Sequence, residues 1–201
     1  MKQKDLLEKL KNLGKPYYTV SDLQIVFQES RAATRKDINR LVKREVLQRV
    51  GRNIYLSPFS GYDPERIAAD FYAPCYLSFE SALAKHGILS QIPYTATFAT
   101  PRRSKKIILG NQEAEYRKVG RGLFFGYRLA KGLPIAEPEK ALLDQLYMVS
   151  LGKAKLDFEE LDLHELSFKK AEKMARKFPK AVQKKLAGLK THWKEIPVTV
   201  G

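Results

Sequence analysis

The sequence predicts an α+β protein in two parts, a small helical domain closed by a hairpin and a larger mixed α/β domain. Three observations support this prediction. Apolar residues recur at helical spacing in the first 45 residues, and short strand-like runs follow one another closely between residues 94 and 129. Pro, Gly, Ser and Asp concentrate in "PFSGYDPER", between the two patterns. We therefore expect an N-terminal domain at residues 1–60 and a C-terminal domain at residues 61–201.

Composition indicates a globular protein with a polyanionic partner. The chain has 201 residues, 44% of them hydrophobic, which suffices for real cores. Its formal net charge is +15. The first sixty residues carry 13 Lys and Arg against 6 Asp and Glu, the most basic balance per residue in the chain. The alternative is a lysine-rich surface that serves solubility, so the location of the charge decides between them.

Targeting signals are not apparent in the sequence. No window approaches the roughly 18 consecutive apolar residues of a membrane span, and the start "MKQKDLLEKL" lacks the apolar stretch of a signal peptide. We expect a cytoplasmic protein with no membrane partner. The single cysteine, Cys75, stands among apolar neighbours and is expected to be a buried structural residue.

The first two helices are indicated by spacing and capping. In "KDLLEKLKNLG" the leucines at 6, 7, 10 and 13 share one helical face, and Gly14 ends the helix. In "SDLQIVFQE", Ser21 and Gln24 have the spacing of a capping box, which predicts a short second helix.

The third helix combines an apolar side with a basic one. Ser30 is expected to cap it, and Ile38, Leu41 and Val42 form its buried face. At 100° per residue most of its basic and amide side chains project from the opposite side or crowd its first turns. These residues are Arg31, Arg35, Lys36, Asn39, Arg40 and Lys43.

A basic hairpin follows the third helix. "VLQRV" and "NIYLS" are expected to form two short strands around the turn "GRN", because Gly and Asn tolerate the positive φ that a tight turn requires. The hairpin carries Arg49, Arg52 and Asn53. Three helices with a basic third, followed by such a hairpin, are the pattern of a winged helix-turn-helix domain.

This pattern predicts binding to double-stranded DNA. A helix fits the major groove, where Arg can pair with guanine and Asn with adenine, while hairpin arginines reach phosphates or the neighbouring minor groove. We expect the DNA target to be a promoter that contains an inverted repeat. A solvated helix surface is the alternative for the charged face, and a three-helix core alone also occurs in protein-interaction modules.

The second part predicts helices around a mostly antiparallel sheet. A helix is expected after Asp63 and Pro64, and "CYLSFESALAKHGIL" reads as a strand entering a helix capped by Ser78. "YTATFAT", "KKIIL", "AEYRKV" and "GLFFGYRL" are expected strands, and "AEPEKALLDQLYMV" is a helix with Ala141, Leu142, Leu146 and Val149 on its apolar side. The tail predicts two or three C-terminal helices, broken at Pro179 and ended at Gly188.

Several fragments, in order, resemble the AbiEi family of type IV antitoxins: "GRNIYLS", "YLSFESALAKHGILSQIP", "ATFATPRRSKKI", "EYRKV", "FFGY" and "IAEPEKALLDQLY". The resemblance covers most of residues 5–190. It implies an N-terminal winged helix that represses its own promoter and a C-terminal domain that counters a nucleotidyltransferase toxin without a stable complex. One departure is "REVL" at residues 44–47, where relatives often have Gly before the first strand of the hairpin.

Residues typical of catalysis or metal binding are sparse. Three histidines, at 86, 164 and 192, and one cysteine give no ligand spacing for zinc, so no metal or cofactor is expected. His86 is expected to bond the last carbonyls of its helix, and "VGRGLFF" to be a turn rather than a phosphate loop. Among Glu137, Glu139 and Asp144, an acid pair is conceivable, but two of them fit the first turn of a helix, where carboxylates complement the helix dipole. We expect no enzymatic activity.

Two more basic clusters lie in the second part. "TPRRSKKI" contains Arg102, Arg103, Lys105 and Lys106 in an expected loop, a possible surface for DNA, RNA or the substrate of a toxin. The lysines near the C-terminus, at 169, 170, 173, 177, 180, 184 and 185, are expected to be a solvated helix face. A winged-helix regulator without a toxin, or an RNA-binding module that opposes a nucleotidyltransferase, remain alternatives to an antitoxin.

Overall fold

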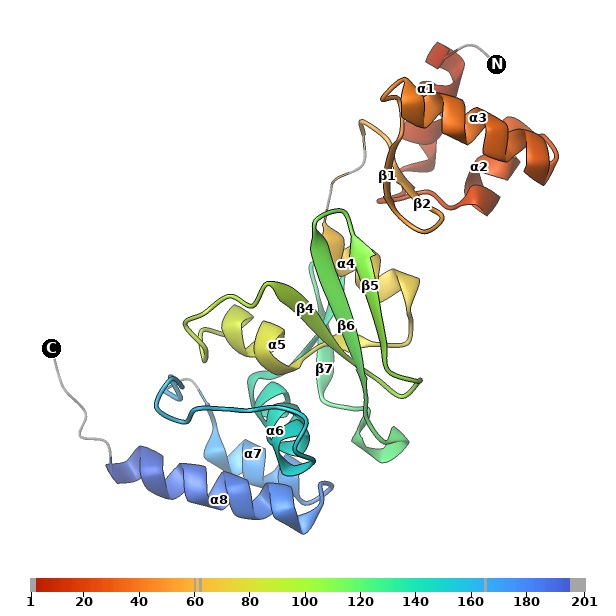
Figure 1. Ribbon diagram of the computed structural model, residues 1–201. Helices are drawn as coiled ribbons and strands as arrows, with labels where there is room; N and C mark the ends of the chain where they lie inside the picture. The colour runs from red at the N-terminus through yellow and green to blue at the C-terminus, as the bar shows by residue number, and fades with distance from the viewer. Residues whose placement is uncertain (1–2, 60, 62, 165, 196–201) are drawn as a thin grey trace, which may run out of the picture. The chain divides into compact units, whose positions relative to one another are not determined.

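The computed structural model describes residues 3–59, 61, 63–164 and 166–195 (Figure 1). It is a mixed α+β structure that divides into two compact units. The first comprises residues 1–68 together with 107–112, and the second comprises residues 69–106 and 113–201. The α+β class expected from the sequence is confirmed.

The first unit contains three helices followed by an antiparallel hairpin, in the expected order. The elements are α1 (Gln3–Leu13), α2 (Val20–Phe27), α3 (Arg31–Lys43), β1 (Gln48–Gly51) and β2 (Ile54–Leu56). One apolar cluster joins them, with Leu10, Leu23, Ile38 and Tyr55 among its buried members. Leu13 is 46% exposed, so it does not belong to the buried face of α1 as expected, because the helix ends there.

Helix α2 begins two residues earlier than the capping pattern predicted. Its N-cap is Thr19, whose hydroxyl accepts from the Asp22 amide at 3.2 Å, while the Asp22 carboxylate accepts from the Thr19 amide at 2.8 Å. The expected capping box of Ser21 and Gln24 is therefore wrong. Both pairs have the required spacing, but Thr19 adds a carboxylate at the third position of the helix, where it complements the helix dipole.

The end of α3 has a conformation that usually selects glycine. Glu45 has φ of 57°. Its amide donates to the Val42 carbonyl at 3.1 Å and the Val46 amide donates to the Leu41 carbonyl at 2.9 Å. These two bonds form a Schellman motif with Glu45 at the left-handed position. The position falls within "REVL", where the resemblance leads one to expect Gly.

We predict that Glu45→Gly stabilises the protein. A side chain in the left-handed region costs about 1–2 kcal/mol, and glycine avoids that cost while adding some entropy to the unfolded chain. The net gain should be about 1 kcal/mol in the free energy of unfolding, measured by urea denaturation. Glu29→Gly, at an exposed position outside the helices, is the control. A loss of stability in Glu45→Gly would show that the Glu45 side chain makes a compensating interaction.

A six-stranded sheet has the order β5-β6-β4-β3-β8-β7, and all of it except residues 107–109 of β5 and Gln112 of β6 belongs to the second unit. The strands are β3 (Tyr76–Leu77), β4 (Thr95–Thr100), β5 (Lys105–Leu109), β6 (Gln112–Lys118), β7 (Tyr127–Ala130) and β8 (Leu133–Ala136). The β3–β4 and β7–β8 pairs are antiparallel, whereas β3–β8 and β4–β6 are parallel. The sheet is thus mixed rather than mostly antiparallel, because strands distant in sequence become neighbours at its centre.

Two expected strands differ in detail. The run "GLFFGYRL" does not form one strand: a 3-10 turn, η1 (Arg121–Leu123), precedes β7, which begins at Tyr127. The expectation that "VGRGLFF" is a turn is confirmed. Strand β8 was not predicted, because Pro134 within it is unusual for a strand that has neighbours on both sides.

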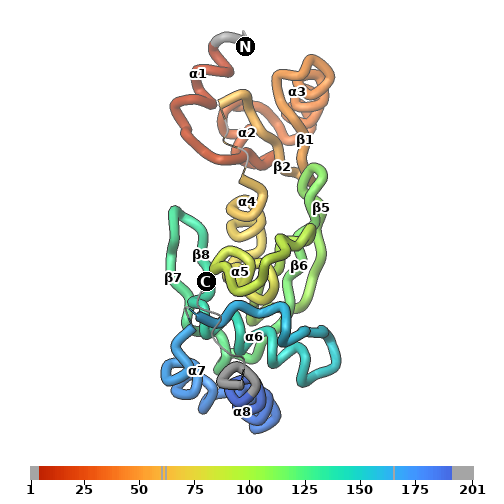
Figure 2. Tube along the Cα trace, turned by 90° about the vertical axis from the view of Figure 1, so that its left-hand side faces the viewer, coloured from red at the N-terminus to blue at the C-terminus, as the bar shows by residue number. Residues whose placement is uncertain are grey.

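The remaining helices belong to the second unit, except for the first turns of α4, since residues up to Ala68 belong to the first unit. They are α4 (Pro64–Phe71), α5 (Phe79–Lys85), α6 (Pro138–Ser150), α7 (Phe168–Ala175) and α8 (Lys180–Glu195). Helices α6, α7 and α8 pack against one another (Figure 2). The tail is broken near Pro179 as expected, but Gly188 lies within α8 and does not end it.

Candidate nucleic-acid interface

Helix α3 is fixed by its cap and by one buried side. The Ser30 hydroxyl accepts from the Ala33 amide at 3.3 Å, which confirms the predicted cap. The buried residues of the helix are Thr34, Ile38 and Leu41, and the Thr34 hydroxyl donates to the Ser30 carbonyl at 3.0 Å. Val42 is half-buried against the same core. The helix therefore has a defined rotation about its axis, with one side turned to the core.

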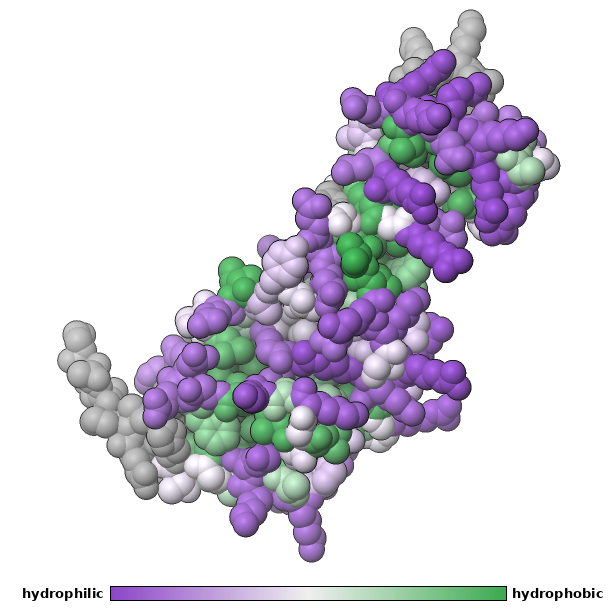
Figure 3. Space-filling model, in the orientation of Figure 1, coloured by the Kyte–Doolittle hydropathy of each residue, from purple (hydrophilic) through white to green (hydrophobic). Residues whose placement is uncertain are grey.

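The other side of α3 carries the basic and amide side chains. The residues of the candidate site on this helix are all exposed: Arg31, Arg35, Lys36, Asn39, Arg40 and Lys43. Figure 3 shows the hydrophilic surface over α3. The Arg40 guanidinium lies 3.1 Å from the half-buried Asp37 carboxylate, an ion pair that orients Arg40 along the helix. The hydrogen-bond donors on this side of the helix extend over a length similar to that of a few base pairs of DNA.

The hairpin presents three further candidates. Arg49, Arg52 and Asn53 are exposed, whereas Ile54 and Tyr55 are buried. Asn53 has φ of 63°, as expected for this turn. The Tyr55 amide donates to the Tyr18 carbonyl at 2.9 Å, so the hairpin is tied to the segment that precedes α2.

A shared core holds α3 and the hairpin in one unit. Ile38 and Leu41 of α3 belong to the same apolar cluster as Val46, Leu47 and Tyr55. Figures 1 and 2 show the hairpin beside the helices of this unit. The nine candidate residues of the first sixty therefore belong to two adjacent elements of one rigid framework.

The basic loop "TPRRSKKI" is built on aromatic residues that the sequence reasoning missed. The Arg102 guanidinium lies 4.2 Å from the centre of the Tyr72 ring and donates to the Ala73 carbonyl at 2.9 Å. Lys105 lies 5.0 Å from the same ring. The Tyr72 hydroxyl donates to the Arg103 carbonyl at 3.0 Å. "FYAP" preceding a strand gave no pattern that would pair Tyr72 with a loop thirty residues later.

The four cations of this loop have different surroundings. All of Arg102, Arg103, Lys105 and Lys106 are exposed, but only the two arginines precede a strand, since Lys105 and Lys106 begin β5. Lys106 pairs with Glu113 at 2.9 Å, and this bond raises the pKa of Lys106. Within the described residues, Arg103 makes no ion pair. Protein contacts therefore hold the side chains of Arg102, Lys105 and Lys106 in place.

The lysines near the C-terminus are largely solvated, as predicted. Those at 169, 170, 173, 177, 180 and 184 are exposed. Lys170 is an exception in its contacts, since it lies 3.2 Å from the Glu137 carboxylate and 3.0 Å from that of Glu139. These two carboxylates therefore have a structural partner on α7.

A buried polar cluster connects α6 with β3 and the residue that follows it. Lys140 and Asp144 are both fully buried and form an ion pair four residues apart. The Lys140 ammonium donates to the Tyr76 hydroxyl at 2.7 Å, and the hydroxyls of Tyr76 and Ser78 donate to Asp144 at 2.9 and 2.8 Å. Burial raises the pKa of Asp144 and lowers that of Lys140. The i, i+4 spacing was visible in "EKALLD", but such pairs are usually exposed.

Cys75 and His86, the other residues considered for chemistry, are held in structural contacts. Cys75 is buried, as expected, and burial raises the pKa of its thiol to about 12. A ring nitrogen of His86 lies 2.8 Å from the Ala136 carbonyl of β8, not from the last carbonyls of its own helix as expected. In the described part of the chain, no three His, Cys, Asp or Glu side chains gather as a metal site would require.

No protein-family model matches the chain, and no curated protein is significantly similar to it. Among the described residues, no helix has both the length and the apolar content needed to span a membrane.

Proposed function

We propose that this protein is a DNA-binding transcriptional regulator whose first unit is a winged helix-turn-helix domain. The observation that carries the proposal is α3, which has a buried apolar side and an exposed side with Arg35, Asn39 and Arg40. Arg and Asn are the side chains best suited to paired hydrogen bonds with guanine and adenine. The base-reading helix is thus α3, and its target is double-stranded promoter DNA.

The hairpin supports the same proposal through charge and position. Arg49 and Arg52 are exposed at its strand and turn. We assign these arginines to the phosphate backbone or the adjacent minor groove. Phosphate contacts contribute affinity without sequence preference, so the hairpin holds the domain while α3 selects the sequence.

The antitoxin role of the proposal rests on the resemblance to the AbiEi family. In this role the protein represses its own operon and its C-terminal part counters a nucleotidyltransferase toxin. The exposed cations Arg102 and Lys105 also fit the alternative of an RNA-binding module, because they lie beside the Tyr72 ring. A plain regulator without a toxin would use the first unit alone.

A salt titration of promoter binding tests the regulator. The affinity should fall with a log–log slope of several units, since each phosphate contact releases about one counterion. Gel-shift measurements with the upstream promoter and with scrambled DNA of the same composition give the comparison. Equal affinity for both DNAs at every salt concentration would reduce the interaction to non-specific charge and contradict the proposal.

A separate genetic test addresses the antitoxin role. Residues 62–201 are expressed from an unrelated promoter in cells that also express the nucleotidyltransferase toxin. This fragment should rescue the cells from the toxin but should not repress the operon promoter. Full-length protein with Asn39 and Arg40 replaced should do the same. It retains the contacts of residues 107–112 with the rest of the first unit, such as the 2.7 Å bond from the Gly110 amide to the Val50 carbonyl. Failure of both folded proteins to rescue would leave a repressor without antitoxin activity.

A further inference from the structure

The last strand of the sheet, β7 (Tyr127–Ala130), has an open edge. Within the described chain, β8 is its one neighbour. Figure 2 shows the β7–β8 hairpin at the left of the second unit, with β7 on its outer side. The first three residues of β7 are exposed. An edge strand of this kind presents backbone donors and acceptors with which another extended segment can pair.

The hairpin turn determines which backbone groups of β7 bond to β8. Lys131 and Gly132 have φ of 49° and 83°, as in a two-residue turn between paired strands. Ala130 and Leu133 flank this turn and are register partners, so they form a hydrogen-bonded pair. In an antiparallel ladder such pairs alternate with pairs that share no hydrogen bond. The backbone groups of Ala130 and Arg128 therefore point toward β8.

Tyr127 and Leu129 consequently turn their amides and carbonyls to the open edge. Two neighbours support this assignment. The Glu137 amide donates to the Gly126 carbonyl at 2.9 Å, which keeps the even-numbered positions on the β8 side. Pro134, the partner of Leu129, has no amide hydrogen to donate toward β7. The open edge therefore offers an amide and a carbonyl on each of Tyr127 and Leu129, spaced as in a β-ladder.

The side chains along this edge are apolar on one face and basic on the other. Tyr127 and Leu129 share a face, because side chains alternate along a strand, and they are 41% and 72% exposed. The Tyr127 ring is held by stacking on the buried Tyr76, with the ring centres 4.6 Å apart. Arg128 lies on the opposite face and is exposed. A strand beside β7 would thus meet apolar side chains at two positions and a positive charge between them.

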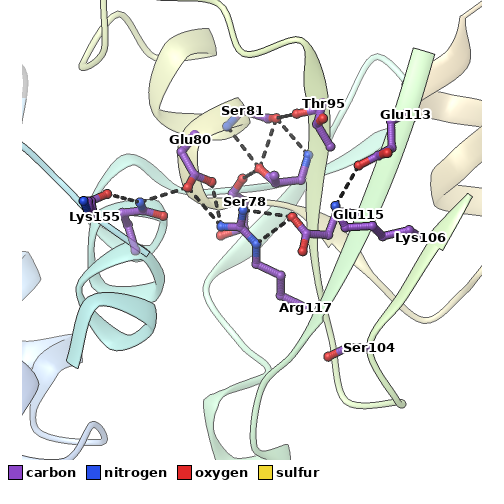
Figure 4. Close-up of polar contacts among 12 residues, drawn as sticks. Ser78, Glu80, Ser81, Thr95, Ser104, Lys106, Glu113, Glu115, Arg117 and Lys155 are labelled. Carbon is purple, nitrogen blue, oxygen red and sulfur yellow. Dashed lines mark hydrogen bonds and ion pairs between the residues drawn. The ribbon is translucent and has the colours of Figure 1, made fainter. Parts of the chain in front are cut away.

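The other edge of the sheet is protected against such pairing. Strand β5 begins with Lys105 and Lys106, and charged side chains on an edge strand discourage association. Figure 4 shows Lys106 paired with Glu113 of β6, at 2.9 Å. The apolar part of β5, residues 107–109, belongs to the first unit. In contrast, β7 turns two apolar side chains to solvent.

A second copy of this chain would pair poorly with the β7 edge. An antiparallel arrangement that matches Tyr127 with Leu129 of the other copy sets the two Arg128 side chains directly opposite each other, and like charges in that position are destabilising. A register centred on Leu129 brings Lys131 of the turn opposite Tyr127, so the pairing ends after one hydrogen-bonded pair. The charge therefore favours a different chain that has a carboxylate opposite Arg128.

We propose that the β7 edge binds an extended acidic segment of a partner protein as an added strand. The segment runs antiparallel to β7, with apolar side chains beside Tyr127 and Leu129 and a carboxylate opposite Arg128. Main-chain hydrogen bonds provide the pairing, and the alternation of apolar and acidic residues provides the selectivity. The net charge of +15 also attracts acidic partners. This binding is independent of the proposed DNA site, because β7 belongs to the second unit and α3 to the first.

Hydrogen exchange of the full-length protein, followed by NMR, tests the proposal. The probe is a peptide of sequence TVEVT with blocked ends, whose glutamate can lie opposite Arg128 and whose valines can bond to Tyr127 and Leu129. The amides of Tyr127 and Leu129 should exchange fast in the free protein and about tenfold more slowly or less when the peptide saturates it. The Arg128 amide, already bonded to β8, should exchange slowly throughout. Absence of saturable binding, or binding that leaves the Tyr127 and Leu129 amides unprotected, would overturn the proposal.

Changes in the peptide separate backbone pairing from side-chain contact. N-methylation of both valine amides should abolish binding, because these amides face β7, whereas N-methylation of the glutamate amide, which faces away, should not. The peptide TVKVT should bind about tenfold more weakly, since the pair at Arg128 changes from attraction to repulsion. The proposal fails if methylation of the valines has no effect, or if TVEVT and TVKVT bind alike.

Variants of the protein complete the test. Arg128→Glu should reverse the preference, so that TVKVT binds more tightly than TVEVT. Leu129→Pro removes an amide that faces the open edge and none that bonds to β8, so the fold should survive and the binding of TVEVT should be lost. Leu129→Ser keeps the amide and should weaken binding about threefold, whereas Ile92→Ser, at an apolar position that is 89% exposed and outside the strands, should not.

Two further measurements distinguish this proposal from its alternatives. Sedimentation of the full-length protein reports self-association: a dimer that Leu129→Pro abolishes would show that a second copy occupies the edge, and would overturn the acidic partner. The Asn39→Ala/Arg40→Ala protein should bind TVEVT as the parent protein does, which separates this outcome from the fate of the DNA proposal.

Discussion

Protein carrying both Asn39→Ala and Arg40→Ala is expected to lose sequence-specific binding to its promoter. Each side chain that pairs with a base edge contributes about 1–3 kcal/mol of discrimination, so the double variant should approach its affinity for scrambled DNA. Both residues are exposed on α3, and neither contributes to the buried side formed by Thr34, Ile38 and Leu41. The fold should therefore survive, which circular dichroism can verify. Gel shifts with the two DNAs measure the effect.

Two single variants separate base reading from charge. Arg52→Ala should weaken binding to all sequences alike, because a phosphate contact carries no sequence information. Lys11→Ala removes an exposed charge of α1, outside the candidate interface, and should change little. The opposite pattern would be informative: if Asn39 and Arg40 are dispensable while Arg102 and Arg103 are essential for specific binding, the second unit reads the DNA.

The first unit could be predicted well from sequence because its structure depends on local rules. Helix α3 was defined by a cap at Ser30 and by apolar residues at helical spacing, and both are properties of nearby residues. The error at α2 had the same local origin, since Ser21 and Thr19 both have capping partners three residues later. The candidate DNA residues followed from the rotation of α3, which a short amphipathic pattern determines.

The second unit was predicted less completely because its structure depends on distant contacts. Strand β3 lies between β4 and β8, and β8 pairs with it in parallel although more than fifty residues separate them. Periodicity identifies strands but not their neighbours. Gln145 illustrates the same limit: helical spacing gives no sign that this polar residue is fully buried and donates to the Glu80 carboxylate, 65 residues earlier in the chain.

Helix α6 departs furthest from its sequence pattern. Ala141, Leu142 and Leu146 were expected on one apolar side, but every residue from 139 to 146 is buried. Two of these buried residues, Lys140 and Asp144, are charged and satisfy each other, with Tyr76 completing the cluster. A buried ion pair of this kind is invisible to periodicity, because the charges look like those of an exposed surface.

Lys140→Met is expected to destabilise the protein by about 3–5 kcal/mol, because removal of one partner leaves a buried charge uncompensated. Methionine approximates the length of the aliphatic chain, and the ammonium that it replaces lies 5.1 and 5.2 Å from the ring centres of Phe125 and Phe178. Packing is therefore largely kept, and the loss comes from Asp144. Urea denaturation of the full-length protein measures the free energy of unfolding. Lys169→Met, at an exposed position of α7, is the control and should have little effect.

The pH dependence of this variant identifies the cause of the loss. Without Lys140, burial raises the pKa of Asp144 in the folded protein further above the unfolded value of about 3.9. A raised folded pKa means that the contribution to stability is complete below the unfolded pKa and is lost as pH rises through the folded one. Lys140→Met should thus be closer to the parent protein at pH 5 than at pH 8. Lys140→Met/Asp144→Asn keeps acceptors for Tyr76 and Ser78 without a charge, so it should be more stable than Lys140→Met at pH 8 and should lack this added pH dependence. If the double variant is instead as unstable as Lys140→Met at both pH values, packing around the lysine chain, and not the charge of Asp144, accounts for the loss.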